Sequence, residues 1–227
     1  MKRIAENLFQ LEASTTNVFI VVGTKDLTLV DTGDAPSVDA LLFEMMDNGW
    51  DWNDVGRVVL THADPESAGG LSVLIGKRPV RVFAHPREIP FLTGAKPMSE
   101  IGGFFKKRKR KKAFPFSPVE SVMPAEPGIP PTGFPHWQVL HTPGPTAGSL
   151  SFYDPVKQIL ICGDMFSNEG KALAVGVGAF DVPYLRKSVE ALAKIDVDIL
   201  CPARGPVVRG GAFRFIEPLI AADDQRV

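Results

Sequence analysis

The segment LTHADPESAGG, residues 60–70, decides the fold because it joins a predicted strand to a predicted helix through a loop of polar residues. The residues RVVLT at 57–61 are rich in β-branched side chains and are predicted to form a short buried strand. A helix is predicted to follow over about residues 66–75. Functional side chains of α/β proteins gather in such loops, so His62 and Asp64 are candidate site residues.

Three further groups of polar residues stand at the ends of predicted strands. They are LVDTGD at 29–34, HTPGPTAGS at 141–149 with CGDMF at 162–166, and CPARGP at 201–206. Apolar runs predict strands at 17–22, 27–30, 80–84, 137–141, 149–153, 158–162 and 199–201, and amphipathic spacing predicts helices at 37–48 and 183–195. Strands meet helices in both halves of the chain, so we predict two sheets packed face to face with helices outside.

In order and spacing, these motifs resemble the metallo-β-lactamase superfamily, and most of all its bacterial branch of hydroxyacylglutathione hydrolases and lactonases. The resemblance covers nearly the whole chain and includes AHPREIPFLTG at 84–94. It implies a four-layer αββα sandwich in which residues 1–227 form a single domain. The stretch at about 95–135 is rich in proline and glycine, and we interpret it as an irregular excursion from that domain.

The resemblance also implies a metal site, but most of its ligands are replaced. Where the family has the pattern His-x-His-x-Asp-His, this chain has His62, Asp64, Glu66 and Ser67. The histidine of a Pro-Gly-His-Gly-Pro segment is Arg204, the second histidine of a His-Thr-Pro-Gly-His segment is Pro145, and the bridging aspartate is retained as Asp164. Only His62 and Asp164 therefore keep the residue type of the family.

The replaced ligands decide how many metal ions we expect. Proline has no side-chain donor atom, and arginine stays protonated and repels a cation. We therefore expect at most one divalent ion, zinc, manganese or iron, held by His62, Asp64 and Asp164. Such an ion acidifies a bound water, and the resemblance then implies a hydrolase that acts on an ester, a thioester or a lactone.

A site without metal is an equally open alternative. If the resemblance holds, Asp64, Glu66 and Asp164 converge at one pit, and clustered carboxylates need a positive partner. Arg204 stands where the last family histidine would point, and its guanidinium can bind a carboxylate in two places. These four residues are the predicted catalytic or ligand-binding group. Without metal, the chain would be a non-catalytic binding or regulatory module for a small molecule.

Several of these residues also have a plain structural interpretation. Asp64 and Glu66 are typical of a helix N-terminus, where the dipole favours acids. Cys162 and Cys201 follow apolar strand residues and are interpreted as small buried hydrophobic residues. The glycine pair 69–70 is interpreted as allowing tight packing of the helix.

The net charge of -1 conceals a basic tract, because KKRKRKK from Lys106 to Lys112 carries +7 and leaves -1 - 7 = -8 for the rest of the chain. Aromatic residues flank this tract, as FFKKRKRKKAFPF at 104–116. A solvated surface run is the plain interpretation. Binding to a polyanion or to an anionic membrane surface is the functional one.

The sequence also predicts a location in the cell. No apolar run approaches the ~20 residues of a membrane span, and no signal-peptide pattern follows the basic N-terminus. The two cysteines are too few for a disulfide scaffold. We therefore expect a cytoplasmic protein.

Overall fold

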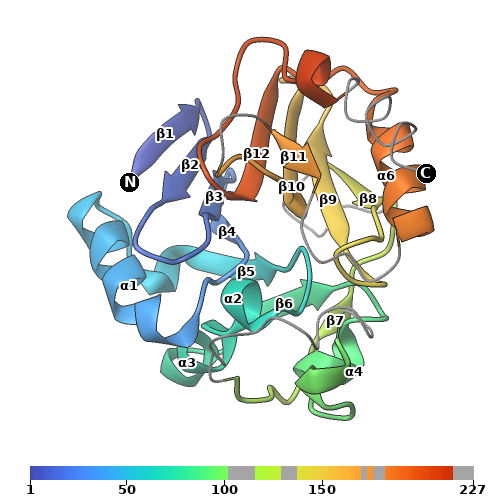
Figure 1. Cartoon of the computed structure of the whole chain (residues 1–227). Coiled ribbons are helices and arrows are strands. Elements are labelled where there is room, and N and C mark those ends of the chain that lie inside the picture. The colour runs from blue at the N-terminus through green and yellow to red at the C-terminus, as the bar shows by residue number, and fades with distance from the viewer. Residues whose placement is uncertain (102–115, 129–136, 170–172, 176–181, 217–227) are drawn as a thin grey trace.

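The computed structural model describes residues 1–101, 116–128, 137–169, 173–175 and 182–216. Two sheets lie face to face with helices on their outer sides (Figure 1). The first sheet has seven strands in the order β1 (Lys2–Ala5), β2 (Leu8–Leu11), β3 (Val18–Val22), β4 (Leu27–Val30), β5 (Val55–Val59), β6 (Arg81–Ala84) and β7 (Met123–Pro124). Its first four strands pair antiparallel, and β4 to β7 pair in parallel.

The second sheet is mostly antiparallel. Its strands are β8 (Gln138–His141), β9 (Leu150–Asp154), β10 (Ile159–Ser167) and β11 (Ala174–Val175), with β12 (Ile199–Arg204) added parallel to β10. Its outer face carries α6 (Val182–Leu192), and the outer face of the first sheet carries α1 (Val38–Asp47), α2 (Pro65–Ala68), α3 (Leu71–Lys77) and α4 (Ile89–Leu92). Single 3-10 turns occupy Ala35–Ser37, Trp52–Asp54 and Met98–Glu100.

Three apolar layers hold these elements together. Phe19 and Val59 of the first sheet pack with Phe152 and Ile161 of the second in the central layer. A second cluster lies between the first sheet and its helices, and a third lies between the second sheet and α6. The burial of both faces of each sheet explains why the central strands are continuous apolar runs. The predicted sandwich of two sheets with helices outside is confirmed.

The predicted helix over 66–75 is wrong in one respect, because it is two short helices, α2 and α3, separated at Gly69 and Gly70. A Cβ on Gly69 would lie 2.2 Å from the Pro65 carbonyl oxygen, and one on Gly70 would lie 2.6 Å from the Thr32 carbonyl oxygen. At Gly70 the chain after β4 interrupts the helix, because the Gly70 amide donates to the Gly33 carbonyl at 2.9 Å. The interpretation of this glycine pair as a tight packing point is confirmed.

Within the described part of the stretch at 95–135, β7 adds to the edge of the first sheet beside β6. The basic tract at 106–112 lies outside the described residues. No helix in the described part of the chain is long and apolar enough to cross a membrane.

Candidate functional site

The candidate residues lie where the carboxyl ends of strands from both sheets meet. His62 and Asp64 follow β5, Asp164 lies in the second half of β10, and Arg204 is the last residue of β12. Carboxyl ends of parallel strands share one edge of a sheet, where α/β proteins bind ligands. The amide of Leu150 donates to the carbonyl of Thr61 at 2.8 Å and joins the two sheets at this edge.

Asp31 holds the end of β5 from which His62 emerges. Its backbone has a φ of 60°, a left-handed conformation that turns the chain sharply after β4. Its two carboxylate oxygens accept hydrogen bonds from the amide and the hydroxyl of Thr61, both at 2.8 Å. Burial raises the pKa of Asp31 to about 6, although attraction to His62 and the hydrogen bonds from Thr61 oppose this shift. Asp31 thus supports the residue that precedes His62.

The hydrogen bonds of Asp31 determine which nitrogen of the His62 ring acts as a donor. When Asp31 is ionised, the Thr61 hydroxyl donates to it, so the Thr61 oxygen accepts from Nδ1 of His62 at 2.9 Å. Nε2 on the other side of this ring lies 3.6 Å from Oδ2 of Asp164. The two residues that keep the family type therefore face each other, and His62 is almost fully buried.

Arg204 joins Glu66 to Asp164. Its Nη2 pairs with Oε2 of Glu66, and its Nε lies 3.2 Å from Oδ1 of Asp164. The three side chains are only 27%, 25% and 15% exposed, in the order Arg204, Glu66, Asp164. Burial opposes the charge on the guanidinium, but attraction to Asp164 and the hydrogen bond with Glu66 outweigh it and raise the pKa of Arg204. A permanent cation therefore lies between two carboxylates.

Asn17 holds the backbone on both sides of Arg204, although no motif pointed to it in the sequence. Its side-chain amide donates to the carbonyls of Pro202 and Gly205 at 2.8 and 2.7 Å. Its backbone amide donates to the carbonyl of Ala203 at 2.7 Å. The only signal in the sequence was its place at the start of a predicted strand, which does not identify a partner 185 or more residues away.

Asp64 and Ser67 lie at the start of α2 and within it. Asp64 is buried at the N-cap of α2, where its side chain accepts from the amide of Glu66 at 3.4 Å. Ser67 is fully buried within α2, and its carbonyl accepts from the Thr32 amide at 2.8 Å. The helix-capping interpretation of Asp64 therefore has direct structural support.

These side chains do not fit a centre of two metal ions. Arg204 contacts both Glu66 and Asp164, and Pro145 supplies no donor atom. Within the described ranges, no group of three or more His, Cys, Asp or Glu side chains is placed to hold a metal ion. Of the predicted metal set, the structure brings His62 and Asp164 together, and Asp64 caps the first turn of α2 through its Oδ1.

Glu88, just before α4, is a further residue near the site that the sequence analysis did not single out. It is buried and accepts hydrogen bonds from the loop after β5 and from the loop between β8 and β9. The segment AHPREIPFLTG contains it, but a glutamate that follows a predicted strand carries no local signal for long-range contacts.

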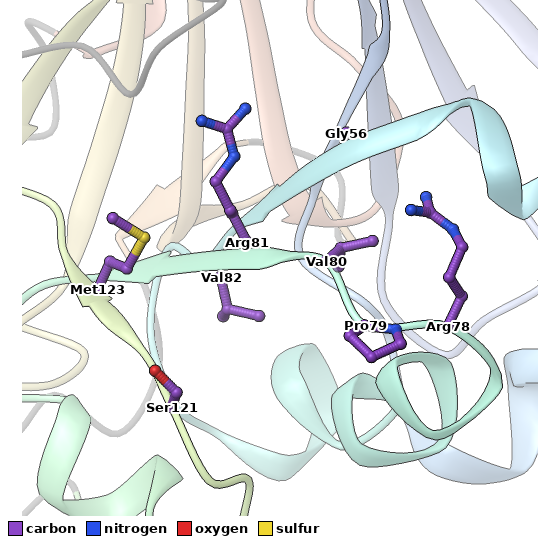
Figure 2. Close-up of a pocket in the computed structure, with 8 residues that line it drawn as sticks. All are labelled: Gly56, Arg78, Pro79, Val80, Arg81, Val82, Ser121 and Met123. Carbon is purple, nitrogen blue, oxygen red and sulfur yellow. The ribbon is translucent and has the colours of Figure 1, made fainter.

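The described residues also form a hollow of about 430 Å³ far from these groups (Figure 2). It is lined by Gly56, Arg78, Pro79, Val80, Arg81, Val82, Ser121 and Met123, at the amino-terminal ends of β5, β6 and β7. Arg78 uses its guanidinium to donate to the carbonyls of Trp52 and Val55, and Arg81 points to the other face of β6 from Val82. The guanidinium of Arg78 is thus held by backbone carbonyls, whereas the candidate residues gather at the opposite ends of the strands. We place the candidate site at those carboxyl ends.

The fold and the order of the motifs together define the class of protein, a sandwich of two sheets with the candidate residues at the strand ends. The model of the metallo-β-lactamase superfamily matches residues 11–204, and the chain belongs to this superfamily. Among curated proteins, the chain is 22% identical over 171 residues to the probable metallo-hydrolase YflN of Bacillus subtilis, a match that covers 70% of this chain. This match spans 64% of the length of YflN.

Solved structures agree with the fold. The metallo-β-lactamase family protein TTHA1429 from Thermus thermophilus superposes with a TM-score of 0.78 at 20% identity, covering 99% of this chain and 81% of that one. TTHA1623, solved in a di-iron-bound form, superposes with a TM-score of 0.68 at 27% identity, covering 88% of this chain and 93% of that one. These chains share the architecture, whereas the ligand chemistry of this chain follows from its own residues.

Proposed function

We propose that this chain is a hydrolase-like member of the metallo-β-lactamase superfamily that binds a small molecule without assembling the two-metal centre. The single observation that carries the proposal is the pairing of Arg204 with both Glu66 and Asp164. In this interpretation the guanidinium supplies the positive charge that a metal ion would supply. The protein then acts as a binding or regulatory module.

Electrostatics favours one fixed cation over an added metal ion. A guanidinium that pairs with two carboxylates already offsets much of the cost of burying them. A divalent ion at Asp164 would lie beside Arg204, whose Nε is 3.2 Å from that carboxylate. Like charges at such distances repel strongly in a partly buried site. Metal binding therefore requires that Arg204 first leave Asp164.

A second candidate function is a hydrolase of the ester, thioester or lactone class, from the hydroxyacylglutathione hydrolase and lactonase branch, with one metal ion. The observation that favours it is the 3.6 Å approach of His62 Nε2 to Asp164 Oδ2. These two residues, with Asp64, would hold the ion. The name of YflN as a probable metallo-hydrolase and the di-iron form of TTHA1623 are consistent with it.

Metal content separates the two candidates. The protein should be purified without a histidine tag and analysed for zinc, iron and manganese before and after chelation. We expect substoichiometric metal and no change of melting temperature on chelation. One tightly held equivalent, with a melting temperature that falls on chelation, supports the hydrolase instead, since a ligand of the folded state adds stability. Two equivalents contradict both candidates.

The role of Arg204 is tested by rebuilding the family ligands with and without it. The double variant Ser67→His, Pro145→His keeps Arg204, and the triple variant adds Arg204→His. If Arg204 occupies the place of the ion, only the triple variant should gain zinc affinity, measured by calorimetry. Equal zinc affinity in the two variants would show that Arg204 does not exclude the metal.

A further inference from the structure

Glu88 is a buried carboxylate in the segment between β6 and α4, and it lies outside the four motif segments. Its exposed fraction is 1%. Burial of a carboxylate is costly unless donors replace the water it loses. The structure supplies three such donors, and they come from two different loops.

The first loop is the one that follows β5 and contains His62. The amide of Ala63, the residue after His62, donates to Oε2 of Glu88 at 2.9 Å. The second loop joins β8 to β9. There the Thr146 hydroxyl and the Gly148 amide donate to Oε1 of Glu88 at 2.8 and 2.9 Å.

Close packing shows how tightly the second loop rests on this carboxylate. A Cβ on Gly148 would lie 2.6 Å from Oε1 of Glu88 and 2.9 Å from Nδ1 of His85. Only glycine leaves room for that approach without a shift of Glu88. The short distance in turn lets the Gly148 amide reach the carboxylate.

We propose that Glu88 is a positioning residue of the site, whose two carboxylate oxygens hold the His62 loop and the loop at 142–149 at a fixed separation. The second loop contains Pro145, the position of a family ligand, so Glu88 sets the distance between two walls of the site. Because the carboxylate is buried and its oxygens are occupied by the three donors, it acts through the loops and not on a ligand. This inference holds whether or not the site takes a metal ion.

The test exploits the need for two acceptor oxygens. Glu88→Gln offers one oxygen and one NH₂ group, so whichever way the amide turns, either Ala63 or Gly148 faces a donor and loses its acceptor. Glu88→Ala removes both acceptors. We expect backbone amide exchange about tenfold faster at one of these two amides in Glu88→Gln and at both in Glu88→Ala.

The matched control is Asp154→Ala. Asp154 is also a buried carboxylate, and its Oδ1 accepts from the amides of Val156 and Lys157 in the turn between β9 and β10. This variant should lose comparable hydrogen bonds without changing the exchange of Ala63 or Gly148. It separates an effect on the site from general destabilisation.

A second measurement reports on His62 itself. The chain has only four histidines, so its imidazole NMR signals can be assigned with single variants. We expect the His62 ring signals to shift in Glu88→Gln and to stay in place in Asp154→Ala, at one fixed pH. If Glu88→Ala does not fold, Glu88→Gln and Thr146→Val, which removes a single donor, still provide the test. Unchanged exchange at both Ala63 and Gly148, together with unchanged His62 signals, in a folded Glu88 variant would overturn the proposal.

Discussion

At the scale of the residue, Arg204 places a permanent positive charge in the candidate site, where the resemblance implies a neutral histidine. It contacts Glu66 and Asp164 from a partly buried position, with 27% of its own side chain exposed. We expect Arg204→Ala to lower the free energy of unfolding by about 1–3 kcal/mol, between the costs of breaking an exposed pair and a buried one. Denaturant titration measures it.

Arg209→Ala is the control for that measurement, because Arg209 is an exposed cation that follows the same strand. Its loss should change the free energy of unfolding by less than about 0.5 kcal/mol. Equal effects of the two substitutions would mean that Arg204 does not neutralise the carboxylates.

The stacked rings of His85 and His141 are a second feature at this scale, with centroids 4.3 Å apart and an angle of 11° between their planes. Burial lowers the pKa of His85 to about 4, and repulsion from His141 and Arg87 adds to the shift. We expect His141→Ala to raise the pKa of His85, measured by NMR titration of its ring. If the pKa of His85 does not change in this variant, the proposed repulsion by His141 is contradicted.

The sign of the effect on stability follows from the same pKa. His85 titrates near pH 6.5 in the unfolded chain and near 4 in the folded one, so the unfolded chain binds more protons between these values. The contribution of His85 to stability is therefore complete above pH 6.5 and is lost as the pH falls toward 4. Substitution of His85 by glutamine should flatten this part of the stability profile.

At the scale of the element, β10 has an irregular register around Gly163. The register of β10 against β12 shifts on both sides of this residue, which directs Asp164 toward His62. Gly163 has a φ of 54°, and a Cβ there would lie 2.7 Å from Oγ1 of Thr61. Gly163 thus has a left-handed backbone conformation and lies close to Thr61, the residue before His62.

We expect Gly163→Ala to lower the free energy of unfolding by about 2–4 kcal/mol, because it adds a steric clash to the backbone cost. Gly49→Ala is the matched control, since Gly49 has a φ of 81° and a Cβ there would have no atom within 4 Å. It should cost only about 1–2 kcal/mol, the backbone part alone. Thermal and denaturant unfolding measure both, and equal losses would contradict the predicted clash with Thr61.

At the scale of the whole molecule, charge is unevenly distributed along the chain, with +7 at 106–112 against a net charge of -1. This tract lies outside the described residues, and its role remains a prediction from the sequence. We expect the protein to bind heparin with an affinity that falls steeply between about 50 and 200 mM salt. Replacement of the seven basic residues by glutamine should abolish the binding.

The control for the tract is the pair Lys2→Gln, Arg3→Gln, two exposed cations of β1. It should leave heparin binding nearly unchanged. Binding that survives neutralisation of 106–112 and is lost in this control would locate the polyanion surface elsewhere.

The sequence by itself determined the architecture and pointed to the residues of the candidate site. Apolar runs and turn residues mark each central strand, because a strand buried on both faces needs continuous apolar side chains. The motif at 60–70 and the segments around Asp164 and Arg204 identified the strand ends at which the site lies. The sequence also predicted the loss of most metal ligands, since proline and arginine cannot coordinate a cation.

Only the tertiary structure decided which of these groups contact one another. Arg204 reaches Glu66 across 138 residues of sequence, and the backbone around it is held by Asn17. Glu88 joins two loops that lie 25 and 60 residues away. Local patterns report burial and secondary structure, whereas such contacts depend on how two sheets approach each other. The helix break at Gly70 has the same origin, because the Gly70 amide donates to the Gly33 carbonyl in the loop after β4.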